Sequence, residues 1–290
     1  MALRQDEDPV SNVEIVSGSS AAKEASAECQ GMNMESIKEI KKILQAASIE
    51  ELPEFIKAYS ADERAGVCKL VETAAKRLEA LQKEILRTEA LCFYEKKYEE
   101  YACICGIDEV GRGPLAGPVV AGAVILPKDC HILYINDSKQ LSEKKREELY
   151  EVIKEQAVAW AVGYASPRRI DEINILQATY EAMRQAVNCL IPEPDLLLND
   201  AVTIPHITIP QVPIIKGDAK SISIGAASIM AKVTRDRLMV EYHKAYPEYD
   251  FAGNKGYGSA GHMEALKKYG PTPIHRKSFL KNLNDMPEQP

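Results

Sequence analysis

The pattern of short apolar segments after residue 100 constrains the fold of this chain most. Two β-rich segments, 103–107 and 119–126, flank a glycine-rich loop, which is typical of two strands joined as a hairpin. Further short apolar segments then alternate with longer amphipathic ones. Strands that come first and are followed by strand–helix alternation favour one mixed sheet with helices on both faces. We therefore predict an α/β fold with a mixed β-sheet flanked by helices.

The spacing of apolar residues places the other elements of this domain. Three further strands are predicted at 157–164, 196–198 and 212–215. The last of these contains a proline, which favours a position at the edge of the sheet. Three helices are predicted at 142–156, 170–190 and 221–246.

The chain before this domain has a different character. Residues 1–33 are polar and without periodicity, and we predict that they are disordered. Residues 34–98 are predicted to form a helical N-terminal extension, which opens with a capping box at Ser36 and Glu39. Apolar residues spaced 4-3-4-3-4 over 67–85 place one stripe on a long helix. The stripe fits a helical hairpin that packs on the main domain, or an accessory that docks or positions a substrate.

The net charge of −7 argues at first sight against a nucleic-acid partner. The charge is unevenly distributed, however. Residues 1–100 carry 14 basic and 20 acidic side chains, whereas residues 210–281 carry 12 basic and 6 acidic ones. The C-terminal half therefore has the charge that a phosphate-binding face needs.

Cysteine usage and hydropathy indicate the cellular compartment of the protein. The seven cysteines include no CxxC pair and match neither a zinc spacing nor a disulfide framework, so reduced thiols are the simpler interpretation. The longest apolar stretches, such as 119–126, are too short to span a bilayer. The acidic N-terminus lacks the apolar run of a secretion signal. We expect a cytoplasmic protein that does not associate with membranes.

Four carboxylates stand where predicted strands, or the loops after them, end: Asp108, Glu109, Asp200 and Asp218. The carboxyl edge of a sheet is where α/β folds place ligand sites. Carboxylates brought together repel one another unless they stay protonated or share cations. Their oxygen ligands suit Mg²⁺ or Mn²⁺, and the five scattered histidines offer no zinc cluster. The pattern therefore predicts a divalent-metal site.

A simpler interpretation exists for each acid taken alone. A single aspartate is more often a helix cap or a turn residue than a ligand. Strict strand alternation would also point Asp108 and Glu109 to opposite faces of the sheet, unless the chain bends there. The glycine that follows Val110 makes such a bend easy.

The loop 111–117 invites a dinucleotide-binding interpretation, which fails. Its glycines are spaced GxGxxxG, and Pro114 precedes a β-rich run where a helix should begin. The glycines better suit close approach of bare backbone to a ligand, with Arg112 available for a phosphate.

These motifs together resemble a known family. Segment 106–120, which opens Gly-Ile-Asp-Glu-Val-Gly-Arg-Gly-Pro-Leu-Ala-Gly, is similar to the signature segment of bacterial ribonuclease HII. The similarity continues in the order of the family through 136–142, 171–176, 216–218, 226–236, 255–257 and 275–279. On this basis we place a type 2 ribonuclease H catalytic domain at 101–285.

The resemblance implies a ribonuclease H-like fold and an endonuclease that acts by two-metal-ion hydrolysis, with Mn²⁺ or Mg²⁺. Its substrates would be the RNA strand of RNA/DNA hybrids and duplex DNA with embedded ribonucleotides. Incision 5′ of the ribonucleotide would leave 3′-hydroxyl and 5′-phosphate ends. The catalytic, metal-binding acids of the family fall on Asp108, Glu109, Asp200 and Asp218. We expect the enzyme to act on these nucleic acids as a monomer.

The resemblance also assigns residues to the substrate. The Gly-Arg-Gly loop of the family, here Gly111, Arg112 and Gly113, would recognise the 2′-hydroxyl that distinguishes RNA from DNA. Tyr257 would stack on the sugar at the deoxy side of the junction. Three lysines in matched motifs are candidates for phosphate contacts: Lys139, Lys216 and Lys232.

Some assignments stay open at this point. Arg235 shares a helix face with Lys232 and fits either a phosphate contact or an ordinary solvated face. His262 and His275 could assist protonation of the leaving group or serve the structure. The chain departs from the family pattern at Ala201 and Gly225, where glycine and alanine are common, and neither change removes a ligand.

Two other functions compete with this one. A type III ribonuclease H shares the fold and the metals but favours long hybrids, and it normally has lysine in place of Arg112. A nucleic-acid-binding scaffold without catalysis is the second alternative, and the presence of all four acids argues against it.

Overall fold

The computed structural model describes residues 35–281, so the disorder predicted for residues 1–33 lies outside the described residues. The chain divides into two compact units, and the boundary between them in the sequence falls between Glu79 and Ala80. In the N-terminal region the helices are α2 (Ile37–Ala46), α3 (Leu52–Tyr59), α4 (Ala65–Leu91) and α5 (Phe93–Lys97).

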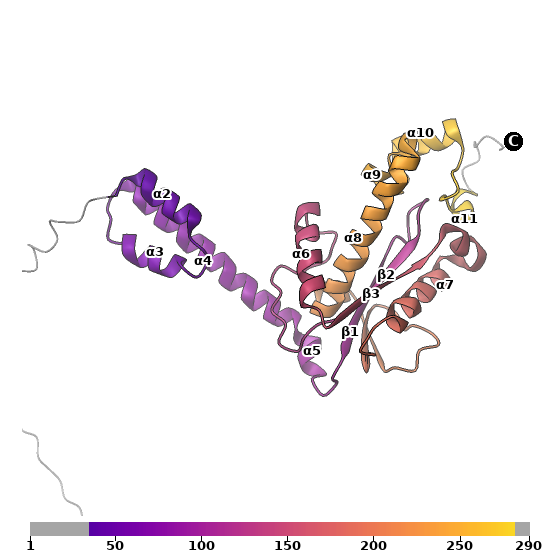
Figure 1. Ribbon diagram of the computed structural model, residues 1–290, viewed down its shortest axis with the longest axis horizontal. Helices are drawn as coiled ribbons and strands as arrows, with labels where there is room; N and C mark the ends of the chain where they lie inside the picture. Colours follow the sequence, from indigo (N-terminus) through magenta and orange to yellow (C-terminus); the bar gives the residue numbers. More distant parts are fainter. Residues whose placement is uncertain (1–34, 282–290) are drawn as a thin grey trace, which may run out of the picture. The chain divides into compact units, whose positions relative to one another are not determined.

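The N-terminal unit is a small helical assembly (Figure 1), and its helices share a core of their own. Its helix α2 begins at the predicted capping box, where the amide of Ser36 donates to Oε2 of Glu39 at 2.8 Å and the amide of Glu39 donates to Oγ of Ser36 at 3.3 Å. The apolar stripe of α4 contributes Val67 and Ala74 to a core shared with α2 and α3. The predicted helical extension is therefore confirmed.

The second unit is built on a five-stranded sheet with the order β3-β2-β1-β4-β5. The strands are β1 (Ile104–Val110), β2 (Val119–Ile125), β3 (Ala159–Ala165), β4 (Leu196–Asp200) and β5 (Gln211–Ile214). Strand β2 runs antiparallel to β1 and β3, whereas β4 runs parallel to β1 and β5. The sheet is thus mixed, as predicted, and the proline-containing strand lies at its edge.

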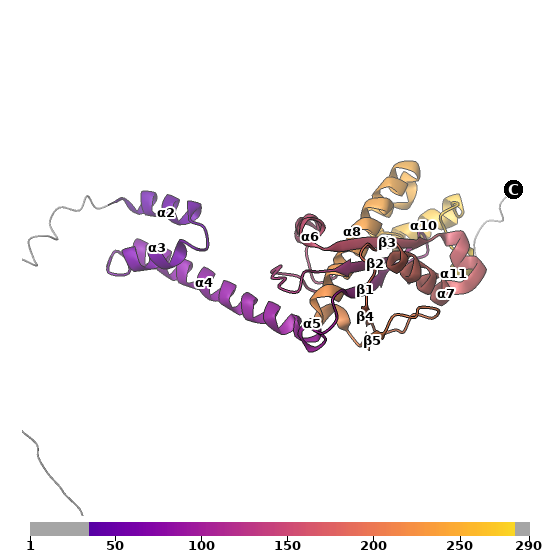
Figure 2. The same ribbon diagram turned by 60° about the horizontal axis from the view of Figure 1, so that its bottom comes forward.

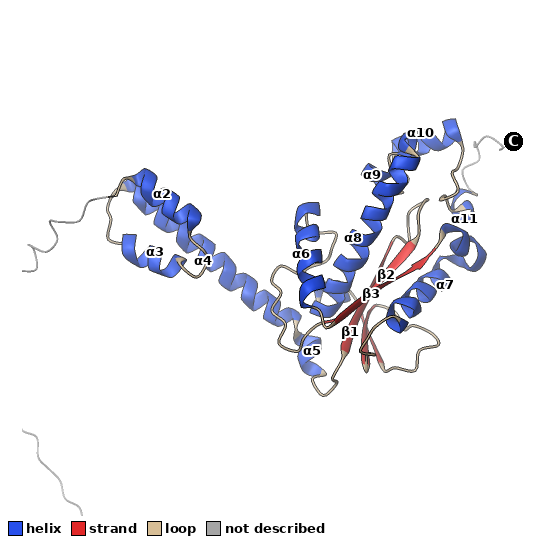
Figure 3. Ribbon diagram, viewed as in Figure 1, coloured by secondary structure: helices blue, strands red, loops and turns tan. Residues whose placement is uncertain are grey.

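Helices cover both faces of this sheet (Figures 2 and 3). They are α6 (Glu143–Gln156), α7 (Pro167–Asn188) and α8 (Ile222–Ala245). Alternate residues of the strands enter two cores, one shared with α7 and the other shared with α6 and α8. This arrangement confirms the predicted fold class. Helix α7 begins earlier than predicted because Ser166 caps its first turn ahead of a proline, and Asn174 interrupts it at φ 69°.

Helix α8 lies unusually close to the sheet, because glycines face it. A Cβ on Gly106 of β1 would lie 2.0 Å from the backbone carbon of Ser223, and one on Gly122 of β2 would lie 2.3 Å from the carbonyl oxygen of Ala227. Small residues on α8, including Ser223 and Ala227, complete the fit. Gly225, one of the two departures from the family pattern, faces Ile135 and Asp218 instead, since a Cβ there would lie 2.7 Å from the side chain of Ile135 and 3.1 Å from the carbonyl oxygen of Asp218. The close packing brings α8 against the strand that carries Asp108 and Glu109.

The C-terminal segment forms a third apolar cluster with the loop between β1 and β2. Its short elements are η3 (Pro247–Tyr249), α9 (Phe251–Asn254), α10 (Ala260–Tyr269) and α11 (Lys277–Leu280). The amide of Leu115 donates to the carbonyl of Gly256 at 2.8 Å, and Ala116 forms a β-bridge with His275. No helix in residues 35–281 combines the length and the apolar character needed to cross a lipid bilayer.

Candidate active site

Three acidic segments meet at one edge of the sheet. Strands β1 and β4 are parallel neighbours in which Ile107 pairs with Asn199, so the residues that follow, Asp108 and Asp200, emerge side by side. Asp218 lies in the 3-10 turn η2 (Gly217–Ala219), which follows β5, the parallel neighbour of β4. The amide of Gly217 donates to Oδ1 of Asp200 at 2.7 Å and holds this turn beside β4.

Asp108 and Asp218 are buried, Glu109 and Asp200 are half-buried, and the four carboxylates act on one another electrostatically. Burial raises the pKa of Asp108 well above its ordinary value, and the charges of Glu109 and Asp200 raise it further, against a hydrogen bond from Ser228. Burial raises the pKa of Glu109, against the hydrogen bond from Arg112. Burial also raises the pKa of Asp218, followed by the charges of neighbouring aspartates. All four predicted acids therefore share one electrostatic environment.

Lys139 lies within reach of the same charges. Burial opposes any rise in the pKa of Lys139, yet four surrounding carboxylates together raise it: Asp137, Asp108, Asp218 and Asp200. Asp137 is an acid that the sequence did not single out, because it follows no strand. Its Oδ1 accepts from the amide of Lys139 at 2.9 Å, and its position in the matched segment 136–142 was the available signal.

The acids fit a hard divalent cation by their donor chemistry, although they form no closed cage. Within residues 35–281, no three acidic, histidine or cysteine side chains are arranged as a ready-made metal group. Magnesium-type sites take few protein carboxylates and complete their shell with water and substrate phosphate. The burial and repulsion that raise the pKa of Asp108 are what a bound cation would offset.

The glycine-rich loop between β1 and β2 lies beside the acids and against Tyr257. Arg112 Nη1 lies 3.1 Å from Oε1 of Glu109, which links the loop to the acidic edge. Gly111 has φ +89°, a conformation that favours glycine. A Cβ on Gly113 would lie 3.6 Å from the ring of Tyr257, which is 49% exposed. The structure thus brings the Gly-Arg-Gly segment and this tyrosine together.

The remaining basic residues differ in their surroundings. Lys216 is exposed and has φ 57°, whereas Lys232 is paired with Asp236 at 2.8 Å. Their contacts with substrate stay predictions. Arg235 matches neither interpretation made from the sequence, because it is fully buried and donates to backbone carbonyls.

Comparison with known proteins decides the family. The model of the ribonuclease HII family matches residues 105–282, and a model described as the ribonuclease HII N-terminal domain matches residues 36–99. The chain belongs to the ribonuclease HII family. It is therefore a metal-dependent endoribonuclease that cleaves the RNA strand of RNA/DNA hybrids.

Relatives support this family assignment over most of the chain. The ribonuclease HII of Lachnoclostridium phytofermentans is 68% identical over 225 residues, 78% of this chain and 89% of that protein. That of Clostridioides difficile is 54% identical over 254 residues, 87% of this chain and all of that protein. Among solved structures, the ribonuclease HII of Archaeoglobus fulgidus, solved in a complex with PCNA, is 25% identical with a TM-score of 0.55, covering 64% of this chain and 98% of that one.

Two histidines of the enzyme form a directed chain of hydrogen bonds in the interior. His262 and His275 are 0% and 3% exposed, and their Nε2 atoms lie 2.9 Å apart. Nδ1 of His275 accepts from the amide of Thr272 at 2.9 Å, so its proton sits on Nε2. Nδ1 of His262 lies 2.8 Å from the carbonyl of Tyr257 and must donate to it. Both rings are therefore neutral, and this burial favours the structural role over proton transfer to a leaving group.

We expect this pair to make the enzyme less stable in mild acid. Burial, followed by the charge of His262, lowers the pKa of His275 from 6.5 to about 4, and burial lowers that of His262. Below pH 6.5 the unfolded chain binds protons that the folded chain excludes, so the free energy of unfolding falls as pH drops. The loss should reach about 2 kcal/mol by about pH 5.

Urea unfolding at a series of pH values measures this loss. His275→Gln should begin less stable, because the chain of hydrogen bonds is broken, but its stability should depend less on pH over the same window. Equal slopes for the two proteins would show that the pair does not titrate as described.

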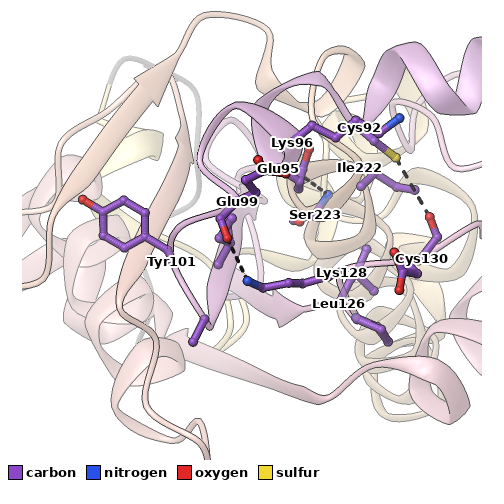
Figure 4. A pocket seen from close by; sticks show the side chains of 14 residues that line it. Cys92, Glu95, Lys96, Glu99, Tyr101, Leu126, Lys128, Cys130, Ile222 and Ser223 are labelled. Carbon is purple, nitrogen blue, oxygen red and sulfur yellow. Dashed lines mark hydrogen bonds between the residues drawn. The ribbon is translucent and has the colours of Figure 1, made fainter.

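A hollow lies near the start of β1, where Ile104 is among its lining residues, and Figure 4 shows it from close by. It has a volume of about 370 Å³ and is lined by α5, the end of β2 and the start of α8. Glu95 accepts from Oγ of Ser221 at 2.5 Å and from the amide of Ser223 at 3.0 Å, so this carboxylate caps α8. None of the predicted site residues lines the hollow.

Proposed function

We propose that this enzyme also incises duplex DNA on the 5′ side of embedded ribonucleotides and leaves 3′-hydroxyl and 5′-phosphate ends. The reaction would be two-metal-ion hydrolysis with Mn²⁺ or Mg²⁺, held by Asp108, Glu109, Asp200 and Asp218. The observation that supports it most is the meeting of these acids at one sheet edge, beside a bare glycine loop that contacts an exposed tyrosine.

Each group has a task that its surroundings suit. Bound divalent ions would supply the positive charge that activates a water and stabilises the leaving oxygen. The acids would hold those ions and lose their mutual repulsion in doing so. Lys139, surrounded by carboxylates, would attract a phosphate to their edge. Gly113 would let the backbone approach the ribose, because it has no side chain in the way, and Gly111 would let the loop pack on Arg235, since a Cβ there would lie 2.2 Å from that side chain.

Arg112 and Tyr257 would recognise the two sides of the junction. Arg112 is tethered to Glu109 and lies between two glycines, so it would bring the loop against the ribonucleotide beside the acids. The half-exposed ring of Tyr257 would stack on the neighbouring deoxy sugar. Lys216 and Lys232 would contact phosphates farther along the strand, the latter only after its pair with Asp236 opens.

Defined duplexes test the proposal. DNA duplexes with one, four or many consecutive ribonucleotides are incubated with the enzyme in Mg²⁺, in Mn²⁺ and without metal. We expect the single-ribonucleotide duplex to be cut 5′ of the ribonucleotide, with ends that a DNA ligase can use only if they are 3′-hydroxyl and 5′-phosphate. Good cutting of the long hybrid alone would favour type III behaviour, and binding without cleavage in either metal would favour a scaffold.

We further propose that the enzyme works as a monomer in the cytoplasm, where it would initiate the removal of ribonucleotides from DNA. The described cysteines are all free thiols, which is consistent with a reducing compartment. Sedimentation equilibrium on the full chain tests the monomer, and a concentration-dependent mass would contradict it.

A further inference from the structure

Two buried arginines lie beneath the loop that joins β1 and β2. Arg235 of α8 and Arg276 are both 0% exposed. Arg235 donates to the carbonyls of Pro118 at 3.0 Å, Lys255 at 2.9 Å and Ala116 at 3.1 Å. Arg276 donates to the carbonyls of Gly117 at 3.0 Å, Arg112 at 2.9 Å and Gly111 at 2.5 Å.

All six acceptors are neutral backbone carbonyls, which compensate only partly for the desolvation of two buried charges. Removing a guanidinium from water costs several kcal/mol unless strong partners replace the water. Within residues 35–281 neither arginine forms an ion pair, and burial together with the charge of Arg235 lowers the pKa of Arg276 to about 9. An apolar side chain would fill the space at lower cost. What the arginines add is a fixed arrangement of the loop backbone.

That arrangement frees the amides of the loop for a ligand. The carbonyls of Gly111 and Arg112 both accept from Arg276 on the buried side. In the part of the chain that the structure describes, the amides of Arg112 and Gly113 donate to no protein acceptor. These amides belong to the segment proposed to recognise the ribose.

Arg235 also connects this loop to the segment that carries Tyr257, whereas the side chain of Arg276 donates to carbonyls of the loop itself. Arg235 reaches Lys255, two residues before the tyrosine, with one nitrogen while its other nitrogens hold Ala116 and Pro118. The amide of Arg276 donates to the carbonyl of Leu115 at 2.9 Å. Arg235 therefore sets the spacing between the loop and the Tyr257 segment, and Arg276 holds the Gly-Arg-Gly end of the same loop in place.

We propose that Arg235 and Arg276 are positioning residues for specificity: they fix the distance between the Gly-Arg-Gly segment and Tyr257 and so match it to the step from a ribonucleotide to a deoxynucleotide. This inference rests on the proposed roles of those two segments. Arginine is required because its planar fork donates to several acceptors at once, whereas lysine keeps the charge on a single nitrogen.

The test compares Arg235→Lys and Arg276→Lys with a matched control, Ile153→Ala. Ile153 is fully buried in the core between α6, the sheet and α8, so its truncation destabilises the fold without touching either segment. Thermal unfolding of all three variants tests whether they are folded and similar in stability. Two selectivities are then measured on the full chain.

The first selectivity is the ratio of kcat/KM on a duplex with one ribonucleotide to kcat/KM on a continuous hybrid of the same sequence. The second is the ratio of Kd values for an all-DNA duplex and for the hybrid, in metal-free buffer. Each lysine variant should lower both ratios by about tenfold, since a small misplacement of binding groups is costly. The kcat on saturating hybrid should change little, and Ile153→Ala should keep both ratios.

Unchanged ratios in a folded lysine variant, or an equal fall in Ile153→Ala, would overturn the inference. If the wild-type enzyme does not incise the single-ribonucleotide duplex, the proposed function fails, but the binding ratio still tests the arginines. If neither lysine variant folds, hydrogen exchange in the wild type decides. The amides of Leu115 and Gly117 should then exchange as slowly as the core strands, and rapid exchange would refute a rigid spacing.

Discussion

Asp108→Asn should reduce cleavage of an RNA/DNA hybrid by at least about a thousandfold, which corresponds to several kcal/mol of transition-state stabilisation. Asp108 is the buried acid in the C-terminal half of β1, next to Glu109 and Asp200. A neutral amide keeps the shape of the side chain but is a poor ligand for a divalent ion. Initial rates over a titration of Mg²⁺ and Mn²⁺ measure the loss.

The same substitution should make the metal-free protein more stable. Burial and neighbouring charges raise the pKa of Asp108 in the folded state. At a pH above the ordinary pKa of an aspartate, the unfolded chain therefore releases this proton more readily than the folded chain does. The carboxylate therefore destabilises the fold increasingly as pH rises toward neutrality. Asparagine removes that effect, so the unfolding midpoint of the metal-free protein at neutral pH should rise.

A charge-matched control separates the site from general electrostatics. Glu155→Gln on α6 removes one negative charge from an exposed position and should change neither rate nor stability appreciably. Wild-type turnover by Asp108→Asn would refute its role as a ligand. Lost activity together with a lower unfolding midpoint would mean that the substitution damages the fold instead.

The strands of the sheet were predictable because each has a local pattern of apolar residues in the sequence. The alternation of short apolar segments and longer amphipathic ones placed every strand within a few residues, and the proline at 213 marked β5 as an edge strand. What local patterns do not contain is the order of the strands. That β4 lies beside β1 and brings Asp200 next to Asp108 depends on contacts across about ninety residues of sequence, and only the family resemblance implied it.

The side chains that support the site were the least predictable. Arg235 and Arg276 look like surface residues by type, since charged groups are rarely fully buried. Their burial depends on backbone carbonyls of a loop more than a hundred residues earlier in the chain. His262 and His275 likewise pair only after α10 and the segment following it fold together. Asp137 escaped notice because a loop, and not a strand end, carries it to the acids.

Tyr257→Ala should lower kcat/KM on a duplex with a single ribonucleotide by about 10–100-fold, because stacking of an aromatic ring is worth about 1–3 kcal/mol. The backbone at this position is held firmly: the amide of Tyr257 donates to the carbonyl of Asn254 at 2.9 Å, and His262 binds its carbonyl. The ring itself remains half exposed beside Gly113. An exposed ring on a rigid backbone is arranged to meet a ligand and not to fill the core.

The pattern of losses across substrates identifies the role. A continuous RNA/DNA hybrid offers no deoxy side in the cleaved strand, so Tyr257→Ala should affect it much less than the junction substrate. Tyr257→Phe keeps the ring and should stay near the wild type on both. Tyr269→Ala provides a matched control, because that tyrosine is also half exposed, at 51%, but lies at the end of α10. Losses of equal size on the junction and the continuous hybrid would show that Tyr257 serves general binding and does not sense the junction.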